Sequence, residues 1–364
     1  MTGILAALRQ DNFTCYGPAS VDDIDISSVP DDRDKRPPRG KFLEVPRPSE
    51  RFLPVPTIAD NDPLLFRFFV DGSQRITNAG YIVDTKNRYL PLLIAQIGVA
   101  TSELHDSRLR IKHYDATNTF FFPDSFSPED LRAAESVACR AAKTSRLPLD
   151  LSFDHYEVDE TDDRSPVDRA RARVLRKLHS MEVDRIVKLA KAGDISRNAL
   201  LLIDGSIEFY VDMERHKEAF RNVVGVAKSF DLHRPYLTGS GAERVGAIIS
   251  RLPTGHRTPA RGTPHRNLTI ASWYLRLHGR SQMASLEYSD GVVKIEVFPD
   301  QPSTDSPKMD ASRCNRLSEH VRALRAPATP NTDARWASHL YPVHLTERYI
   351  KTQFRNDQSI RACL

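Results

Sequence analysis

Two similar stretches, Phe68-Phe69-Val70-Asp71-Gly72-Ser73 and Leu201-Leu202-Ile203-Asp204-Gly205-Ser206, decide the predicted fold. Each is an apolar run of strand length that ends on a carboxylate and is followed by Gly. Burying a carboxylate without a partner costs several kcal/mol, so packing alone does not explain an Asp at the end of a buried strand. Two such strands side by side in one sheet place Asp71 and Asp204 at the same edge. Carboxylate oxygens at close range are ligands for Mg²⁺ or Mn²⁺.

Such a site is typical of metal-assisted phosphodiester hydrolases. A simpler interpretation stays open, because Asp-Gly is a common turn dipeptide and a strand that ends in Asp-Gly-Ser is often only a hairpin corner. The repetition of the motif, with the same Ser after the Gly, shifts the balance toward function.

The 364-residue chain has the composition of a globular protein, with 40% hydrophobic and 27% charged residues. This length suffices for one large or two modest domains. The net charge of +4 does not by itself demand a nucleic-acid partner. The four cysteines lie far apart without a CxxC pair, which argues against a structural zinc site or a disulfide framework and fits a reducing cytoplasm. The sequence shows no membrane span and no secretory signal, so we expect a cytoplasmic protein that does not associate with membranes.

The chain divides into three predicted parts. Residues 1–60 are polar and Pro-rich at many positions, which predicts an extended arm that packs on its own domain or lies across a partner. Residues 61–354 form the predicted α/β domain, a mixed sheet flanked by helices, and residues 355–364 form a tail. We expect strands at 64–70, 89–100, 108–114, 198–204 and 223–228, a hairpin at 284–299, helices at 128–143, 166–192 and 316–324, and a last helix that Pro342 opens.

Two charged residues are placed where they can join the predicted metal site. Glu182 lies on the apolar stripe of the predicted helix 166–192, four residues after Leu178, so helical spacing aims its carboxylate at the core. It is either paired with a base such as Arg185 or a metal ligand, and the sequence leaves both open. Lys228 ends a predicted strand, where its ammonium group can neutralise the acids or hold a scissile phosphate. A Lys at a strand terminus is, however, more often a surface residue.

Residues 251–280 contain six Arg and three His and no acidic residue. Clustered Arg usually marks a solvated face. A basic loop that contains Pro and Gly and has no balancing acid also favours nucleic-acid contact, because Arg matches phosphates and aromatic rings stack on unpaired bases. The predicted nucleic-acid-binding residues are Arg257, Arg261, Arg266, Trp273 and Arg276.

The order of these features resembles the NurA nuclease family over residues 61–354. The order is strand-Asp-Gly-Ser, a strand meander, a long helix with Glu, strand-Asp-Gly, strand-Lys, an aliphatic strand pair with Glu296, and a terminal helix that begins with Tyr-Pro. The resemblance implies an RNase H-like fold and a DNA nuclease that uses Mn²⁺ or Mg²⁺ in two-metal hydrolysis to resect DNA ends. It also implies a homodimer that works with a HerA-type hexameric ATPase, which translocates duplex DNA.

The resemblance assigns the candidate site residues by position. The family usually has an Ala-His pair a few residues into its last helix. The same register here gives Arg348-Tyr349, and the nearest histidine is His344. The implied catalytic residues are Asp71, Glu182, Asp204, Lys228, Tyr341 and His344, of which Asp71, Glu182 and Asp204 are the implied metal ligands.

Two other functions stay open at this point. One is a nuclease-derived DNA-binding adaptor subunit that docks on an ATPase and does not cut, which fits the divergent last helix and the basic stretch. The other is a phosphoesterase that acts on small phosphate esters and not on DNA.

Overall fold

The computed structural model describes most of the chain. The described residues are 3–18, 41–58, 62–106, 108–159, 164–210, 215–238, 241–265, 268–279, 288–300, 307–327 and 337–364.

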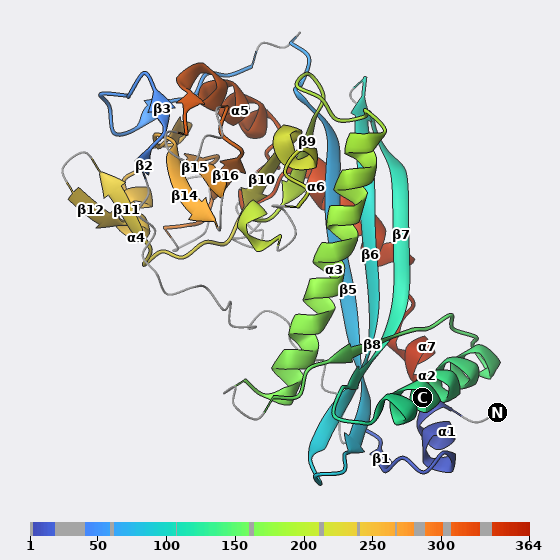
Figure 1. Ribbon diagram of the computed structural model, residues 1–364. Coiled ribbons are helices and arrows are strands. Elements are labelled where there is room, and N and C mark those ends of the chain that lie inside the picture. The colour runs from blue at the N-terminus through green and yellow to red at the C-terminus, as the bar shows by residue number, and fades with distance from the viewer. Residues whose placement is uncertain are drawn as a thin grey trace.

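One large mixed sheet organises the described residues (Figure 1). It has 13 strands, with the main order β2-β14-β15-β16-β10-β9-β5-β6-β7-β8 and with β1, β4 and β13 attached beside this path. The strands are β1 (Cys15–Tyr16), β2 (Lys41–Phe42), β4 (Leu53–Pro54), β5 (Phe66–Val83), β6 (Tyr89–His105), β7 (Arg108–Pro123), β8 (Ser152–Tyr156), β9 (Leu200–Asp204), β10 (Val223–Ala227), β13 (His256–Arg257), β14 (Arg261–His265), β15 (Leu268–Arg276) and β16 (Val292–Val297).

Smaller elements complete the fold. Two further sheets have two strands each. β11 (Pro235–Thr238) pairs with β12 (Gly241–Arg244), and β3 (Glu44–Val45) pairs with β17 (Met309–Asp310). The helices are α1 (Ile4–Gln10), α2 (Pro128–Thr144), α3 (Pro166–Lys191), α4 (Val245–Ile249), α5 (Ala311–Ala323), α6 (Tyr341–Gln353) and α7 (Asp357–Arg361), with the 3₁₀ turns η1 (Ile207–Phe209) and η2 (Ala219–Asn222).

The middle of the sheet has the architecture that the sequence predicts. β5, β6 and β7 form an antiparallel meander. β9 runs parallel to β5, and β10 runs parallel to β9. The resulting order β7-β6-β5-β9-β10, with helices against the sheet, confirms the predicted α/β class and its RNase H-like mixed sheet.

The first predicted strand is longer than its sequence signal. We expected it to span 64–70 and to turn at Gly72, but β5 continues through Asp71, Gly72 and Ser73 to Val83. The cause is β6, which pairs in regular register with every β5 residue from 68 to 78, so the Asp-Gly-Ser segment is held in the ladder. The second copy does turn, because Gly205 adopts a φ of +122°, which favours glycine.

The two long helices begin as predicted. Ser127 and Ser165 each accept a hydrogen bond from a backbone N–H of the first turn, and a Pro follows each cap. α3 packs on the face of β5 that carries Val70, and α6 packs on the opposite face. Successive residues of a strand alternate between its faces, so neighbouring β5 side chains meet different helices. None of the described helices combines the length and the apolar character needed to cross a membrane.

The described parts of the predicted arm and tail join this fold. The backbone N–H groups of Ile4 and Leu5 in α1 donate to the carbonyl groups of Cys363 and Leu364, which brings the two ends of the chain together beside α2 (Figure 1). β1 pairs with β5, and β2 pairs with β14. Residues 19–40 of the predicted arm lie outside the described residues.

The basic stretch 251–280 is not the loop that we expected. It contains β13, β14 and β15, and β15 pairs with β16 in the core of the sheet. β16 pairs antiparallel with β15, and the turn before β16 contains Gly291 at a φ of +71°. The first part of the predicted hairpin 284–299 lies outside the described residues. Residues 280–287 are outside the description.

Candidate functional site

Asp71 and Asp204 lie on adjacent parallel strands. β5 and β9 pair as far as Val70 and Ile203, so the two aspartates follow at the same level of the sheet. Asp71 is buried, with 6% of its surface exposed. Its Oδ1 atom accepts a hydrogen bond from the backbone N–H of Gly72 at 2.9 Å, whereas its buried Oδ2 atom has no hydrogen-bond partner in the described part of the chain. Unpaired buried carboxylate oxygens are rare, so this atom marks a place for a ligand.

Burial disfavours ionisation of both aspartates. Burial raises the pKa of Asp71 well above its usual range, and the carboxylates of Asp204 and Glu347 raise it further. Burial also raises the pKa of Asp204, against the opposing charge of Lys228. The Nζ atom of Lys228 lies 2.6 Å from Oδ2 of Asp204. Three carboxylates thus surround one ammonium group, and a divalent cation among them would favour their ionised forms.

The last helix and the residues just before it contribute three side chains to this region, two of which we did not predict from the sequence. The imidazoles of His339 and His344 and the carboxylate of Glu347 form a group whose ligand atoms all lie within 4.8 Å of one another. Nδ1 of His339 is also 3.1 Å from Nζ of Lys228, which links this group to Asp204. His344 was predicted for the site, but His339 and Glu347 were missed. The sequence offers a signal only for Glu347, which lies three residues after His344 and therefore on the same side of a helix.

These side chains fit the predicted metal. Carboxylate oxygens suit Mg²⁺ and Mn²⁺, and imidazole nitrogens suit Mn²⁺ and the later transition metals. The Oδ2 atom of Asp71 supplies a buried oxygen to which no described residue donates a hydrogen bond. The donor set therefore suits at least one divalent cation in the space between β5, β9 and α6.

α6 begins with the predicted Tyr-Pro pair, but the Tyr side chain is exposed to solvent. Tyr341 is the first residue of α6 and is 48% exposed. In the register where the family has its histidine stands Tyr349, whose ring packs edge-on against Tyr114 with centroids 5.6 Å apart. The catalytic role of Tyr341 stays a prediction.

Glu182 points to the core as predicted, but from the other face of β5. A Cβ atom built on Gly72 would lie 2.5 Å from Oε1 of Glu182, so the glutamate lies directly against that strand position. Because Gly72 faces α3, its neighbour Asp71 faces α6. Glu182 is therefore not on the face that holds Asp71, and its charge is the weakest of the four that act on that residue. This geometry corrects the expectation that Glu182 completes the same metal cage.

The partner of Glu182 is also settled. Its Oε2 atom accepts a hydrogen bond from the Tyr210 hydroxyl at 2.9 Å. Arg185, the predicted alternative partner, pairs with Asp115 instead. Burial raises the pKa of Glu182 to about 8, while the hydrogen bond from Tyr210 lowers it and the charge of Asp204 raises it. Near neutral pH the protonated form of Glu182 therefore predominates.

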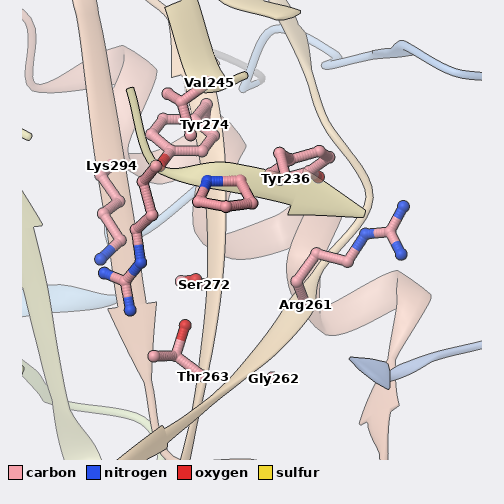
Figure 2. A pocket seen from close by; sticks show the side chains of 10 residues that line it. Tyr236, Val245, Arg261, Gly262, Thr263, Ser272, Tyr274 and Lys294 are labelled. Carbon is pink, nitrogen blue, oxygen red and sulfur yellow. The ribbon is translucent and has the colours of Figure 1, made fainter. Parts of the chain in front are cut away.

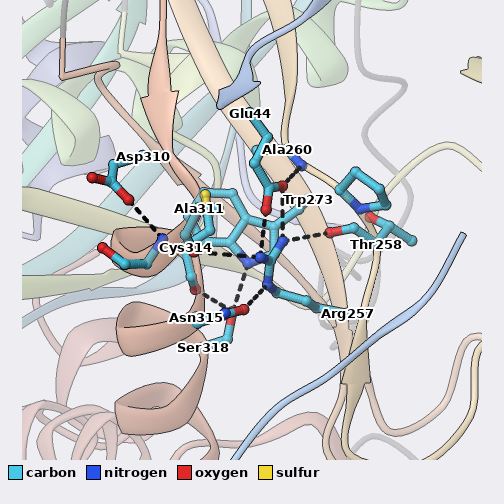
Figure 3. A network of polar contacts seen from close by, with 12 residues as sticks. Glu44, Arg257, Thr258, Ala260, Trp273, Asp310, Ala311, Cys314, Asn315 and Ser318 are labelled. Carbon is cyan, nitrogen blue, oxygen red and sulfur yellow. Dashed lines mark hydrogen bonds and ion pairs between the residues drawn. The ribbon is translucent and has the colours of Figure 1, made fainter. Parts of the chain in front are cut away.

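The structure contradicts the predicted nucleic-acid contacts of Arg257 and Trp273, which are both fully buried (Figure 3). Arg257 donates to both carboxylate oxygens of Glu44, at 2.6 and 2.9 Å, and to Oδ1 of Asn315. Trp273 donates from Nε1 to Oγ of Ser318 at 2.8 Å. Both side chains form hydrogen bonds within the protein and are part of its core. No local sequence pattern predicts this pairing, because Glu44 is 213 residues from Arg257.

Arg276 and Arg261 are buried as well, and Arg266 lies outside the described residues. Arg276 donates to backbone carbonyl groups, which need no acidic residue nearby in the sequence. Arg261 lies over the ring of Phe42 and lines a pocket of about 30 Å³, which has room for one or two water molecules but no substrate. Figure 2 shows the Arg261 guanidinium directed away from Lys294, so these cations do not converge on one anion.

A larger groove lies at the other end of β9. Its volume is about 840 Å³, and the apolar residues Leu65, Leu200 and Phe298 are among those that line it. Five cations line it, and two of them are paired with acids, Arg221 with Glu218 and Arg313 with Asp300. These cations come from separate segments of the chain, so no local run of charged residues in the sequence predicts the groove. They are Arg197, Lys217, Arg221, Arg313 and Arg316.

Comparisons with known proteins give a structural likeness but no match in sequence. No protein-family profile and no curated protein sequence matches the chain. Among solved structures, the crystal structure of the NurA nuclease from Sulfolobus solfataricus aligns over 82% of each chain, with 8% sequence identity and a TM-score of 0.42. A likeness at this level assigns neither a family nor the role of any residue, so the site rests on the geometry described above.

Proposed function

We propose that this protein is a deoxyribonuclease that hydrolyses phosphodiester bonds with Mn²⁺ or Mg²⁺. The observation that carries the proposal is the buried Oδ2 atom of Asp71, which lacks a hydrogen-bond partner among the described residues and lies within a group of three carboxylates and one ammonium. Buried negative charge of this kind is costly in the absence of a cation. Its position on the central strands of an RNase H-like sheet suits the hydrolysis of a phosphodiester.

The chain's own residues have separable roles in this proposal. Asp71 and Asp204 hold the metal on adjacent strands, and the rigid ladder of β5 and β9 fixes their spacing. When bound, Mn²⁺ or Mg²⁺ supplies an activated water and stabilises the leaving oxygen. Lys228, oriented by its ion pair with Asp204, offers its ammonium group to a phosphate oxygen. Glu182 supports β5 from the α3 side as a positioning residue.

We also propose that the groove with the five cations contacts the DNA substrate. Three of its cations, Arg197, Lys217 and Arg316, are exposed and have no acidic partner in the described part of the chain. β9 separates the groove from Asp204 by four residues, or roughly 13 Å at about 3.3 Å per strand residue. Charge reversal at Arg197 and Lys217 should weaken DNA binding and flatten its salt dependence, because each phosphate contact releases counterions. An unchanged salt dependence would place the substrate elsewhere.

The order of sequence motifs supports a further proposal on partners. It implies a homodimer that works in the cytoplasm with a HerA-type hexameric ATPase on DNA ends. The mass of the purified protein in solution tests the dimer. Co-purification with an ATPase encoded beside its gene tests the complex.

Cleavage assays test the proposed function directly. The purified chain is titrated with Mn²⁺ and with Mg²⁺ on linear duplex and single-stranded DNA, before and after treatment with a chelator. Metal-dependent cleavage that the chelator abolishes is the expected result. DNA binding without cleavage would instead favour the adaptor subunit, and turnover of small phosphate esters alone would favour the phosphoesterase.

A further inference from the structure

His339, His344 and Glu347 form a compact group of ligand atoms at the start of α6. Their ligand atoms lie within 4.8 Å of one another, and all three residues are half-buried. His344 and Glu347 stand three residues apart on α6, and the rings of His339 and His344 meet edge-on with centroids 5.7 Å apart. The fold thus holds the three side chains together, and each of them is partly exposed to solvent.

We propose that these three residues form a cation site of their own, beside the aspartates, that takes a transition-metal ion such as Mn²⁺, Co²⁺ or Zn²⁺ in preference to Mg²⁺. Two imidazole nitrogens and one carboxylate oxygen are donors that such ions favour, whereas Mg²⁺ favours oxygen alone. The use of this ion in cleavage rests on the proposed function, but the site itself does not.

The surroundings of the group support a cation at this position. Glu347 raises the pKa of both Asp71 and Asp204, so the third carboxylate lies close to the two strand aspartates. The Oδ2 atom of Asp71 is buried without a hydrogen-bond partner in the described residues. Together these features leave negative charge and an unused oxygen on the side of the sheet that α6 covers.

Lys228 connects the two parts of this region and responds to metal binding. Its Nζ atom lies 2.6 Å from Asp204 and 3.1 Å from Nδ1 of His339. A histidine that binds metal through Nε2 carries its proton on Nδ1, so Nδ1 then cannot accept a hydrogen bond from an ammonium group. Metal bound through Nε2 must therefore release Lys228 from His339, and metal bound through Nδ1 must displace it. In either case Nζ becomes available to a phosphate, which makes Lys228 a positioning partner of the site.

Metal-binding measurements without DNA test the site. Calorimetry with Mn²⁺ and with Mg²⁺, and the visible absorption of bound Co²⁺, are compared for the wild-type chain, His344→Ala and Glu347→Gln. We expect the variants to lose Mn²⁺ affinity by at least about 10-fold and to change the Co²⁺ spectrum, with a smaller effect on Mg²⁺. His105→Ala and Glu218→Gln, which alter exposed residues outside the group, are the matched controls and should leave both readouts unchanged.

The outcomes separate this inference from the nuclease proposal. Mn²⁺ affinity and a Co²⁺ spectrum that His344→Ala leaves unchanged would overturn the site, even in a chain that cleaves DNA. Loss of both signals in a chain that never cleaves DNA would support the site and reject the nuclease. The conservative variant His344→Gln, checked by thermal unfolding, guards against a variant that fails to fold, and it should also lose the nitrogen-dependent Co²⁺ spectrum.

Discussion

Two buried charged groups in this protein are built in opposite ways. The Glu44–Arg257 cluster (Glu44, Arg257 and Asn315) matches one carboxylate with one guanidinium, and both carboxylate oxygens accept hydrogen bonds from Arg257. The carboxylate cluster (Asp71, Asp204, Glu347 and Lys228) holds three acids and one base, and among the described residues one oxygen of Asp71 has no hydrogen-bond partner.

The contrast shows how to distinguish structural charge from functional charge in this fold. Burial of a charge is tolerated where a partner and hydrogen bonds compensate it, as around Arg257. Where the compensation is incomplete, the free energy of the group improves when a ligand supplies the missing charge. The shortage at Asp71 thus points to a cation, whereas the hydrogen bonds of Arg257 explain why this arginine is buried although no acidic residue lies near it in the sequence.

The largest expected effect tests the functional side of this contrast. Asp71→Asn removes a proposed metal ligand, so we expect Mn²⁺-dependent cleavage to fall by about 1,000-fold or more, equivalent to about 4 kcal/mol of transition-state stabilisation. The free energy of unfolding without metal should not fall, because the variant removes a carboxylate that burial disfavours. Initial cleavage rates and chemical denaturation in chelator measure the two effects.

A matched control for this variant is Asp84→Asn. Asp84 is also a buried aspartate, directly after β5, but Arg88 pairs with it at 2.6 Å. The control should lower stability and leave cleavage intact. If Asp71→Asn instead destabilises the protein and cleaves DNA at the normal rate, the two buried clusters are alike and the assignment of Asp71 is wrong.

The second effect tests the structural side. Arg257→Ala leaves Glu44 buried without its partner, and breaking a buried ion pair in this way costs about 3–5 kcal/mol. The double variant Glu44→Leu with Arg257→Met should recover much of this loss, because well-packed apolar residues can replace a buried pair. Denaturation midpoints measure both. A small loss in Arg257→Ala together with weaker DNA binding would restore the original prediction that this arginine contacts DNA.

The parts of the fold that sequence could predict depend on local signals. The Ser-Pro starts of α2 and α3 are set by neighbouring residues, and the repeated Asp-Gly-Ser motif correctly placed Asp71 beside Asp204. The missed features depend on contacts between distant segments. The length of β5 depends on pairing with β6, and the role of Arg257 depends on Glu44, 213 residues away. Glu347 joins the site only because α6 packs on β5.

A third, smaller effect concerns pH and sharpens the contrast on the α3 side of β5. Glu182 has its pKa raised from an ordinary value of 4.5 to about 8, chiefly by burial. Between these values the folded chain keeps a proton that the unfolded chain has lost, so stability falls as pH rises through this window and levels off above it. The slope from this group is at most about 1.4 kcal/mol per pH unit.

The variant Glu182→Gln should remove this part of the slope. The measurement is the free energy of unfolding in chelator from pH 5 to pH 9. Burial raises the pKa of Asp84, but the hydrogen bonds from Arg88, Ser125 and Lys86 together lower it below its usual value, so the control Asp84→Asn should change the pH dependence only in acid, below this window. A wild-type slope that persists in Glu182→Gln would mean that this carboxyl group is ionised in the folded chain.

The smallest expected effect tests whether Glu182 is a structural or a functional buried acid. Tyr210→Phe removes the hydrogen bond to Glu182 and keeps the ring in contact with Phe220, so we expect a loss of about 1 kcal/mol in stability. Because that hydrogen bond lowers the pKa of Glu182, the variant should also extend the pH-dependent window upward. Cleavage should change by only a few-fold, since Glu182 approaches β5 from the face opposite Asp71. A loss of cleavage comparable to that of Asp71→Asn, with stability unchanged, would show that Glu182 reaches the metal in the working enzyme and that α3 or β5 shifts to admit it.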